Sequence, residues 1–285
     1  MAWYLLFFAV IGAVSAIVGV AWAVDAWILP RVTGKHKELD KRIERIESKI
    51  GQIAEYLDGL PQIADQKRKA GFEKAYHLYK EQNYREAIPA FEACFAPEAT
   101  LRQRTALHVT IGNSFLRLSE LEEAMGHYKQ AETLAMEAND KEGLSAAVGN
   151  LGNVYLTKGD LDKALEYYQQ ALKIDREIGK REGEANDLGN MGIVYGIKGE
   201  LDKALEHHQQ ALKIDREIGN REGEASDLGN MGNVYRIKGE LDKALEYYQQ
   251  ALEIFEDMGA NLEAERTKAK IRILVEAKAK LPYPG

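Results

Sequence analysis

The chain has 285 residues, of which 45% are hydrophobic and 29% charged, and it contains six prolines, a composition typical of ordered globular protein. Its formal net charge of −7 disfavours nucleic acid as a partner and mildly favours basic partners. The single cysteine, Cys94, excludes an intrachain disulfide framework, and no His or Lys flanks it to activate a thiolate.

The first predicted element is a membrane-spanning helix within residues 1–29. Residues 2–24 carry no charge, and Trp3 and Trp22 would be separated by ~28 Å of helix, close to the ~30 Å of a hydrocarbon core. Under the positive-inside rule, the basic residues that follow predict an outside N-terminus and a cytoplasmic remainder of the chain. These residues are Arg31, Lys35, Lys37, Lys41, Arg42, Arg45 and Lys49.

Two alternatives remain open for this element. Ala21-Trp22-Ala23 resembles a signal-peptide cleavage site, although no Lys or Arg precedes the apolar run and the run is longer than usual. A face of small residues would let membrane helices approach closely, or it reflects the ordinary composition of a span. The residues on that face are Gly12, Ala16, Gly19 and Ala23.

Residues 30–61 are predicted to form a juxtamembrane heptad segment after Pro30 and Gly34 interrupt the first helix. Apolar residues alternate at spacings of four and three, which predicts a coiled coil and a homo-oligomer formed through residues 36–60. The alternative is a single helix folded onto the first repeat. The apolar residues are Leu39, Ile43, Ile46, Ile50, Ile53, Leu57 and Leu60.

Residues 62–260 repeat with a period of 40. Residues 161–199 and 201–239 are identical at 33 of 39 positions. Each unit predicts a helix A, a tight turn and a helix B: Gly159 suits the end of helix A, Asp160 the start of helix B, and Gly179 the end of helix B. Gly152 lies on the stripe that faces helix B, where the absence of a Cβ permits close packing.

The repeated positions resemble the tetratricopeptide repeat (TPR) signature. They are Gly152, Tyr155, Gly159, Ala164, Tyr168 and Ala171, then Gly192, Tyr195, Gly199, Ala204, His208 and Ala211, then Gly232, Tyr235, Gly239, Ala244, Tyr248 and Ala251. An earlier unit fits through Gly112, Phe115, Ala124, Tyr128 and Ala131, and a degenerate one surrounds Ala75, Ala87 and Phe91. The 40-residue form is similar to the repeats of kinesin light chains and Pins-type adaptors, and Arg176 and Arg216 stand where the shorter form usually has Pro.

The resemblance implies an all-α fold, a right-handed TPR helical solenoid. The expected organisation is a transmembrane helix (1–29), a heptad segment (30–61), an array of about five repeats (62–260), and a C-terminal capping helix and tail (261–285).

The resemblance also implies a binding groove lined by the A helices. Two columns of residues are expected on it: Thr110, Asn150, Asn190 and Asn230, and Asn113, Asn153, Ile193 and Asn233. An Asn amide offers a donor and an acceptor, which suits the backbone of an extended peptide. The alternative is that these amides bind neighbouring helices. The predicted peptide-binding residues are Asn113, Asn150, Asn153, Asn190, Asn230, Asn233 and Arg236.

No enzymatic constellation is recognisable, and no cofactor is expected. His207 and His208 point ~100° apart on a helix and do not indicate a metal site. KGELDK and KGDLDK lack the residues of a phosphate-binding loop. The sequence therefore predicts a membrane-anchored adaptor that binds an extended segment of a partner protein. The alternative is a structural scaffold that assembles through the heptad segment and the repeat ends.

Overall fold

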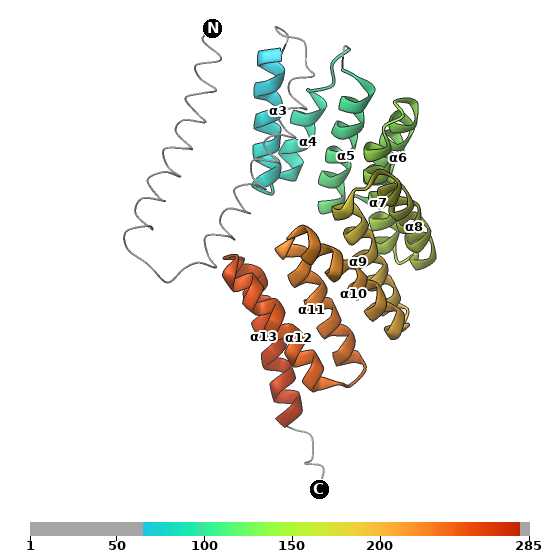
Figure 1. Ribbon diagram of the computed structural model, residues 1–285. Coiled ribbons are helices and arrows are strands. Elements are labelled where there is room, and N and C mark those ends of the chain that lie inside the picture. Colours follow the sequence, from blue (N-terminus) through green and yellow to red (C-terminus); the bar gives the residue numbers. More distant parts are fainter. Residues whose placement is uncertain (1–64, 98, 280–285) are drawn as a thin grey trace, which may run out of the picture. The chain divides into compact units, whose positions relative to one another are not determined.

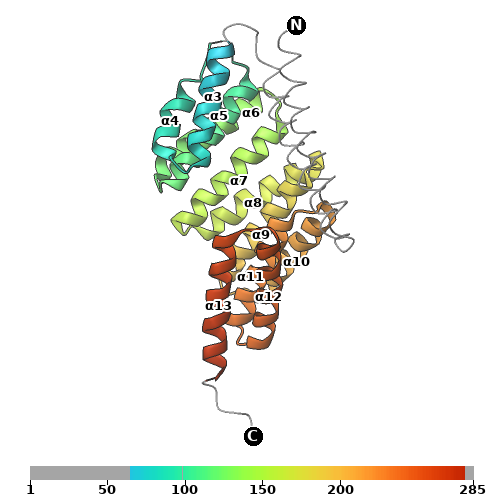
Figure 2. The same ribbon diagram turned by 90° about the vertical axis from the view of Figure 1, so that its left-hand side faces the viewer.

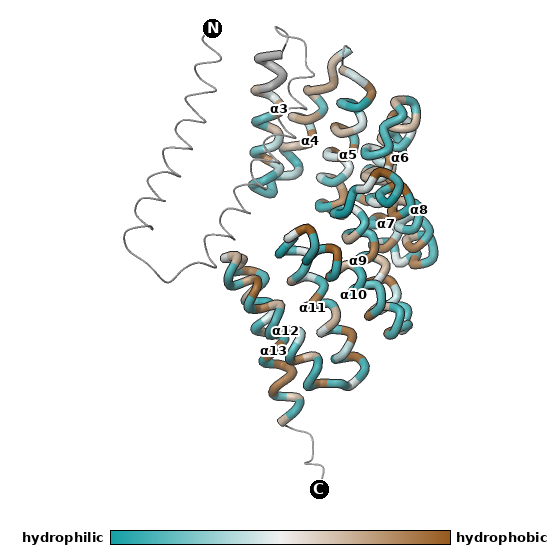
Figure 3. Tube along the Cα trace, in the orientation of Figure 1, coloured by the Kyte–Doolittle hydropathy of each residue, from teal (hydrophilic) through white to brown (hydrophobic). Residues whose placement is uncertain are grey.

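The computed structural model describes residues 65–97 and 99–279 (Figure 1). The predicted membrane-spanning helix and heptad segment fall outside these residues and stay predictions. Within the described part of the chain there are eleven helices and no strand. None of these helices is long and apolar enough to cross a bilayer, and Figure 3 shows hydrophobic and hydrophilic residues interspersed along them.

The helices form five antiparallel pairs followed by one further helix. Each helix packs against its neighbours in sequence, as Figures 1 and 2 show from two directions. The pairs are α3 (Asp65–Lys80) and α4 (Tyr84–Glu92), α5 (Leu101–Arg117) and α6 (Leu121–Glu137), α7 (Lys141–Lys158) and α8 (Leu161–Ile178), α9 (Arg181–Ile197) and α10 (Leu201–Ile218), and α11 (Arg221–Ile237) and α12 (Leu241–Asp257), before α13 (Asn261–Ala279). The predicted all-α repeat solenoid is confirmed.

The ends of the helices follow the predicted capping pattern. Gly159 and Gly179 adopt left-handed φ values of 78° and 71°, which glycine reaches without the penalty of a Cβ. The side chain of Asp160 accepts a hydrogen bond from the backbone N–H of Lys163 at the start of α8. Local sequence signals therefore determine where helix A ends and helix B begins.

In four of the five helix pairs an aromatic ring of helix B packs directly on a glycine of helix A. Tyr168 is fully buried, and a Cβ built on Gly152 would lie 2.7 Å from its Cε1. The same seat recurs in three other units, between Gly112 and Tyr128, Gly192 and His208, and Gly232 and Tyr248. No real side chain tolerates such a distance, so glycine is required here in spite of its cost of ~1 kcal/mol in a helix.

The A helices form a continuous layer. Along the array, α5 contacts α7, α7 contacts α9, and α9 contacts α11, whereas the B helices α6, α8, α10 and α12 approach one another less closely. The array must therefore bend so that the A helices lie on its inside. We call the side of this layer that faces away from the B helices the inner surface.

Ion pairs with a constant offset of 36 residues mark the register between units. Lys158 pairs with Glu122, Lys198 with Asp162, and Lys238 with Asp202, each at 2.7 Å. Lys278 of α13 pairs in the same way with Asp242. Such exposed pairs contribute little stability, but the shared offset places α13 as helix A of a further unit without a helix B in the described chain.

A second set of ion pairs explains the arginines at 176 and 216. Arg176 Nε lies 2.9 Å from Glu184, and Arg216 Nε lies 2.9 Å from Glu224. Both carboxylates are buried and belong to the first turn of the next helix A. A guanidinium at this position therefore links the ends of α8 and α10 to the first turn of the helix A that follows each of them.

Replacing Gly152 with Ala tests the glycine seat. We expect Gly152→Ala to lower the urea midpoint of unfolding, because an overpacked core costs ~1–3 kcal/mol, more than the helix propensity of Ala returns. Gly126→Ala is the matched control, since a Cβ at this exposed position of α6 meets nothing within 4 Å. The control should raise the midpoint. Equal stabilisation by both substitutions would contradict the proposed seat.

Candidate functional site

The residues predicted to line a peptide-binding groove all lie on A helices. Asn113 lies on α5, Asn150 and Asn153 on α7, Asn190 on α9, and Asn230, Asn233 and Arg236 on α11. The asparagines are partly exposed and Arg236 is exposed. The structure separates the asparagines into two groups with different partners.

Asn113, Asn153 and Asn233 hold the buried tyrosines. Their Oδ1 atoms accept hydrogen bonds from the hydroxyls of Tyr128, Tyr168 and Tyr248 at 2.7, 2.7 and 2.8 Å. Burial raises the pKa of each of these tyrosines, which keeps the hydroxyl protonated as a donor. The amide of helix A thus satisfies the polar end of the ring that sits on the glycine.

The unit formed by α9 and α10 departs from this pattern at both partners. Ile193 occupies the place of the asparagine, and His208 occupies the place of the tyrosine. The buried His208 turns instead to the next unit, where its Nδ1 lies 2.9 Å from Oδ1 of Asp227. The two replacements compensate each other. His208 has no hydroxyl to donate, so residue 193 does not need to supply an acceptor. This paired change is a sequence signal that would have linked the two positions.

In the second group of asparagines the side-chain Nδ2 donors remain available to other partners. This group consists of Asn150, Asn190 and Asn230. Asn150 Oδ1 accepts from Asn153 Nδ2 at 3.1 Å, and Asn230 Oδ1 accepts from Asn233 Nδ2 at 3.5 Å. Within the described residues, no hydrogen bond engages the Nδ2 groups of Asn150, Asn190 and Asn230. Amide donors therefore repeat along the inner surface, and the peptide-binding role of these residues stays a prediction.

The two remaining predicted positions differ from the asparagines. Thr110 bonds to its own helix, with Oγ1 donating to the carbonyl of Ala106 at 2.8 Å. Arg236 lies close enough to Tyr248 to lower the pKa of that tyrosine against the larger, opposite effect of burial. Arg236 itself is exposed in the last turn of α11.

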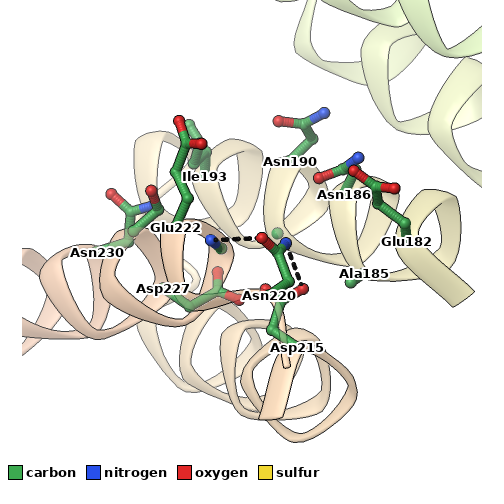
Figure 4. A pocket seen from close by; sticks show the side chains of 13 residues that line it. Glu182, Ala185, Asn186, Asn190, Ile193, Asp215, Asn220, Glu222, Asp227 and Asn230 are labelled. Carbon is green, nitrogen blue, oxygen red and sulfur yellow. Dashed lines mark hydrogen bonds between the residues drawn. The ribbon is translucent and has the colours of Figure 1, made fainter. Parts of the chain in front are cut away.

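A hollow of about 340 Å³ opens between α9 and α11 (Figure 4). Asn190 and Asn230 line it from successive A helices, with Ile193 between them in the repeat pattern. The hollow is mainly polar, and no Lys or Arg is among the residues that line it. These are Glu182, Ala185, Asn186, Gly189, Asn190, Ile193, Asp215, Asn220, Glu222, Gly223, Ser226, Asp227 and Asn230.

Buried carboxyl groups follow the repeat at two junctions. Asp175 and Asp187 lie 40 residues before Asp215 and Asp227, and all four are less than a tenth exposed. Burial, reinforced by the charge of Asp175, raises the pKa of Asp187 to about 8. Burial and then the charge of Asp227 raise the pKa of Asp215 to about 6, against a hydrogen bond from Asn220 that lowers it.

The buried carboxyls are not equally satisfied. Asn220 Nδ2 donates to Asp215 Oδ1 at 2.9 Å, and His208 binds Asp227. Oδ1 of Asp175 and Oδ2 of Asp187 have no hydrogen-bond partner among the described residues. Sequence reasoning did not single out these carboxyls, because an acidic residue on a helix is usually solvated.

The described residues hold no group of three or more His, Cys, Asp or Glu side chains placed to bind a metal ion. His207 and His208 diverge as their adjacent positions require. His207 packs against Tyr195 with ring centroids 4.9 Å apart and the ring planes tilted by 42°, while His208 is buried.

The comparisons with known proteins agree with this geometry. A family model described as tetratricopeptide repeat matches residues 102–177 and 183–257, which together make up more than half of the chain. The chain belongs to the tetratricopeptide repeat family. The resemblance that the sequence predicted is thereby confirmed. No curated protein matches the chain significantly.

Solved TPR structures share the fold at low identity. A STAND signal-transduction ATPase with a tetratricopeptide repeat sensor from Pyrococcus horikoshii has a TM-score of 0.63 at 21% identity, over 73% of this chain and 32% of that chain. A Rap protein complexed with competence and sporulation factor has a TM-score of 0.63 at 14% identity, over 69% and 56%. This TPR chain therefore spans about a third and about half of those proteins.

A third structure matches over nearly its whole length. It is a kinesin light chain-type protein from Podosopora anserina with nearly identical TPR-like repeats, with a TM-score of 0.53 at 16% identity, over 67% of this chain and 96% of that one. At these identities the likeness shows the fold alone.

Alanine substitutions should separate the two groups of asparagines. We expect Asn153→Ala to lower the free energy of unfolding by ~1–3 kcal/mol, because the buried Tyr168 hydroxyl loses its acceptor. Asn190→Ala should be neutral or slightly stabilising, since Ala is the better helix former by roughly 0.6 kcal/mol. Urea unfolding of both variants measures the two changes in the free energy of unfolding. A smaller loss in Asn153→Ala than in Asn190→Ala would show that the tyrosine bond contributes nothing.

The buried Asp187 predicts a specific pH dependence. Folded Asp187 keeps its proton up to about pH 8, whereas an unfolded Asp releases it near pH ~4. Below pH ~4 the carboxyl is protonated in both states and its contribution to the free energy of unfolding is complete. As the pH rises towards 8 this contribution is lost, because only the unfolded state can release the proton. Asp187→Asn removes this loss.

The stability of Asp187→Asn relative to the wild type should therefore increase with pH, by on the order of 1 kcal/mol per unit between pH ~4 and ~8. Urea unfolding at a series of pH values measures the difference. Glu166→Gln, at an exposed position of the neighbouring α8, should show no such trend. A flat difference for Asp187→Asn would mean that this carboxyl ionises normally in the folded chain.

Proposed function

We propose that this TPR protein is an adaptor whose inner surface binds an extended segment of a partner protein. The observation that carries the proposal is the repetition of amides with open donors on successive A helices, at Asn150, Asn190 and Asn230. A repeated array of identical polar groups suits a repeated ligand, and a polypeptide backbone is such a ligand.

The spacing of the units fits an extended chain. Packed helices lie ~8–10 Å apart and a strand rises ~3.3 Å per residue, so each unit would meet about three residues of the segment. The amides would bind backbone groups of any sequence, and the side chains between them would provide specificity.

Two of these amides, Asn150 and Asn230, are held by hydrogen bonds from the core before any ligand binds. Tyr168 donates to Asn153, and Asn153 donates to Asn150, so a chain of hydrogen bonds runs from the buried core to the inner surface. A side chain held in this way loses less conformational entropy when it binds a ligand. Asn190 lacks such a tether because Ile193 stands beside it, and it opens onto the hollow instead.

The similar structures support this proposal at the level of the fold. In one of them a Rap protein is complexed with competence and sporulation factor, and in another the repeats form the sensor of a STAND ATPase. A bound factor in the first protein and a sensor made of these repeats in the second are consistent with ligand binding by this fold.

We further propose that residues 1–29 anchor the adaptor in a membrane with the N-terminus outside and the repeats in the cytoplasm. The uncharged stretch at residues 2–24 and the basic residues that follow it support this topology. Partner binding would then bring the partner to the membrane.

The rival proposal is a structural scaffold that assembles through the heptad segment and the repeat ends, and the stacking of repeat ends meets an obstacle at α13. Arg272 stands 40 residues after Gly232, at the position where a glycine would seat the ring of a helix B. A helix B could not seat an aromatic ring at Arg272 as it does on the glycines of four other units.

A triple substitution tests the adaptor proposal. Segments selected from a random twelve-residue display library on the full-length protein should lose at least tenfold in affinity for Asn150→Ala/Asn190→Ala/Asn230→Ala. The loss follows because each backbone group buried without its partner costs ~1–3 kcal/mol. The melting temperature of the variant should stay the same or rise. Unchanged affinity with a lower melting temperature would make the asparagines structural and refute the groove.

Protease accessibility tests the topology. Protease added outside intact cells should leave the repeats undigested and should digest them after the cells are permeabilised. Digestion of the repeats in intact cells would reverse the proposed orientation.

A further inference from the structure

We propose that the hollow between α9 and α11 binds a cationic side chain, the ammonium of a Lys or the guanidinium of an Arg, from the extended segment on the inner surface. The inference rests on the proposed function and adds the chemistry of the partner to it. The hollow, the carboxyl groups around it and the preceding unit of the same chain all lead to this assignment.

Four carboxyl side chains border the hollow and no basic side chain does. Figure 4 shows Glu182 on α9, Glu222 and Asp227 on α11, and Asp215 at the end of α10, with the amides of Asn186, Asn190 and Asn230 around them. Asp215 and Asp227 are almost fully buried, so their charges are screened less than surface charges. The surroundings are therefore electronegative and contain hydrogen-bond acceptors for a cation.

The preceding junction of the chain contains a cation of its own. There Lys180 pairs with Glu142 at 3.2 Å, and its charge counteracts the effect of burial on the pKa of Asp175 and of Asp187. Glu142, Asp175 and Asp187 precede Glu182, Asp215 and Asp227 by 40 residues. The equivalent of Lys180 at the second junction is Asn220, which is neutral.

The loss of this lysine leaves the second junction short of positive charge. Asn220 satisfies one oxygen of Asp215 but brings no charge, and Glu182 has no ion pair among the described residues. The neighbouring guanidinium groups bind other carboxylates. Arg181 pairs with Glu184 and Glu217, and Arg216 and Arg221 both pair with Glu224.

The equivalent aspartates of the preceding junction, Asp187 and Asp175, are also almost fully buried. Asp187 is 6% exposed and its Oδ2 has no hydrogen-bond partner among the described residues, and the same holds for Oδ1 of Asp175, which is 3% exposed. Oδ1 of Asp187 lies 3.4 Å from the place of a Cβ on Gly149, just as Oδ1 of Asp227 lies 3.2 Å from that of Gly189 on the hollow. At neutral pH, however, Asp187 keeps its proton and Lys180 already lies at this junction, so, of these two junctions, the lack of a cation is specific to the hollow between α9 and α11.

Fluorescence polarisation with synthetic peptides tests the inference on the full-length protein. The probe is a labelled nonapeptide, Gly-Lys-Gly-Gly-Lys-Gly-Gly-Lys-Gly, at low ionic strength. Its counterparts carry Nε-acetyl-lysine or Glu at the same places. We expect the lysine peptide to bind at least tenfold more tightly than either counterpart and to lose affinity as salt is added.

Substitutions at the hollow should remove this preference. Glu182→Gln/Glu222→Gln should weaken binding of the lysine peptide at least tenfold, whereas Glu206→Gln, on an exposed position of α10, should not. Asn220→Lys reproduces the preceding junction within the hollow. It should abolish the preference for lysine without lowering the melting temperature, because its ammonium would take the ligand's place beside Glu182.

The outcomes distinguish this inference from the proposed function. If segments selected by display bind well but neither prefer lysine nor respond to Asn220→Lys, the cation site is wrong and the adaptor stands. Equal binding of the lysine and acetyl-lysine peptides, or no binding of the lysine peptide, overturns the inference. Stoichiometric displacement of the lysine peptide by micromolar Ca²⁺ or Mg²⁺ would also overturn it, by assigning the hollow to a metal ion.

Discussion

The close approach of helix A and helix B at a glycine is the constraint on which the rest of this TPR protein depends. An aromatic ring pressed onto Gly152 is buried completely, so its hydroxyl needs a partner inside the protein. Asn153 supplies that partner from helix A, and its remaining amide donor reaches Asn150 on the inner surface. The packing requirement of the core thus determines which polar groups stand where a ligand would bind.

The chemistry of the inner surface changes where the repeat departs from its own pattern. In the unit of α9 and α10, Ile193 and His208 replace the asparagine and tyrosine, and the histidine binds Asp227 of the next unit. At the turn between α10 and α11, Asn220 stands at the position that Lys180 occupies one repeat earlier, and the polar hollow is lined by no Lys or Arg. The near-identical units give the array a uniform framework. The few residues that differ between units can give it specificity for a ligand.

Much of the fold followed from the sequence, because period and capping are local properties of a helix. The 40-residue spacing, the glycine at 159, the acidic cap at 160 and the small residue at 152 predicted the helix pairs that the structure contains. The hydrogen-bond partners of the asparagines could not be predicted from the sequence. Periodicity shows which residues share a face, and it does not show that Asn153 binds a side chain 15 residues away. The hollow escaped prediction because it depends on distances between helices and on a missing charge at 220.

The central claim is that the inner surface binds an extended segment, and NMR of side-chain amides tests it most directly. Addition of a display-selected segment to the ¹⁵N-labelled protein should shift the Nδ2 resonances of Asn150, Asn190 and Asn230. Those of Gln170, Gln210 and Gln250, on the B helices, should stay unchanged. The reverse pattern, with shifts confined to the B-helix glutamines, would place the partner on the opposite side of the array and contradict the account.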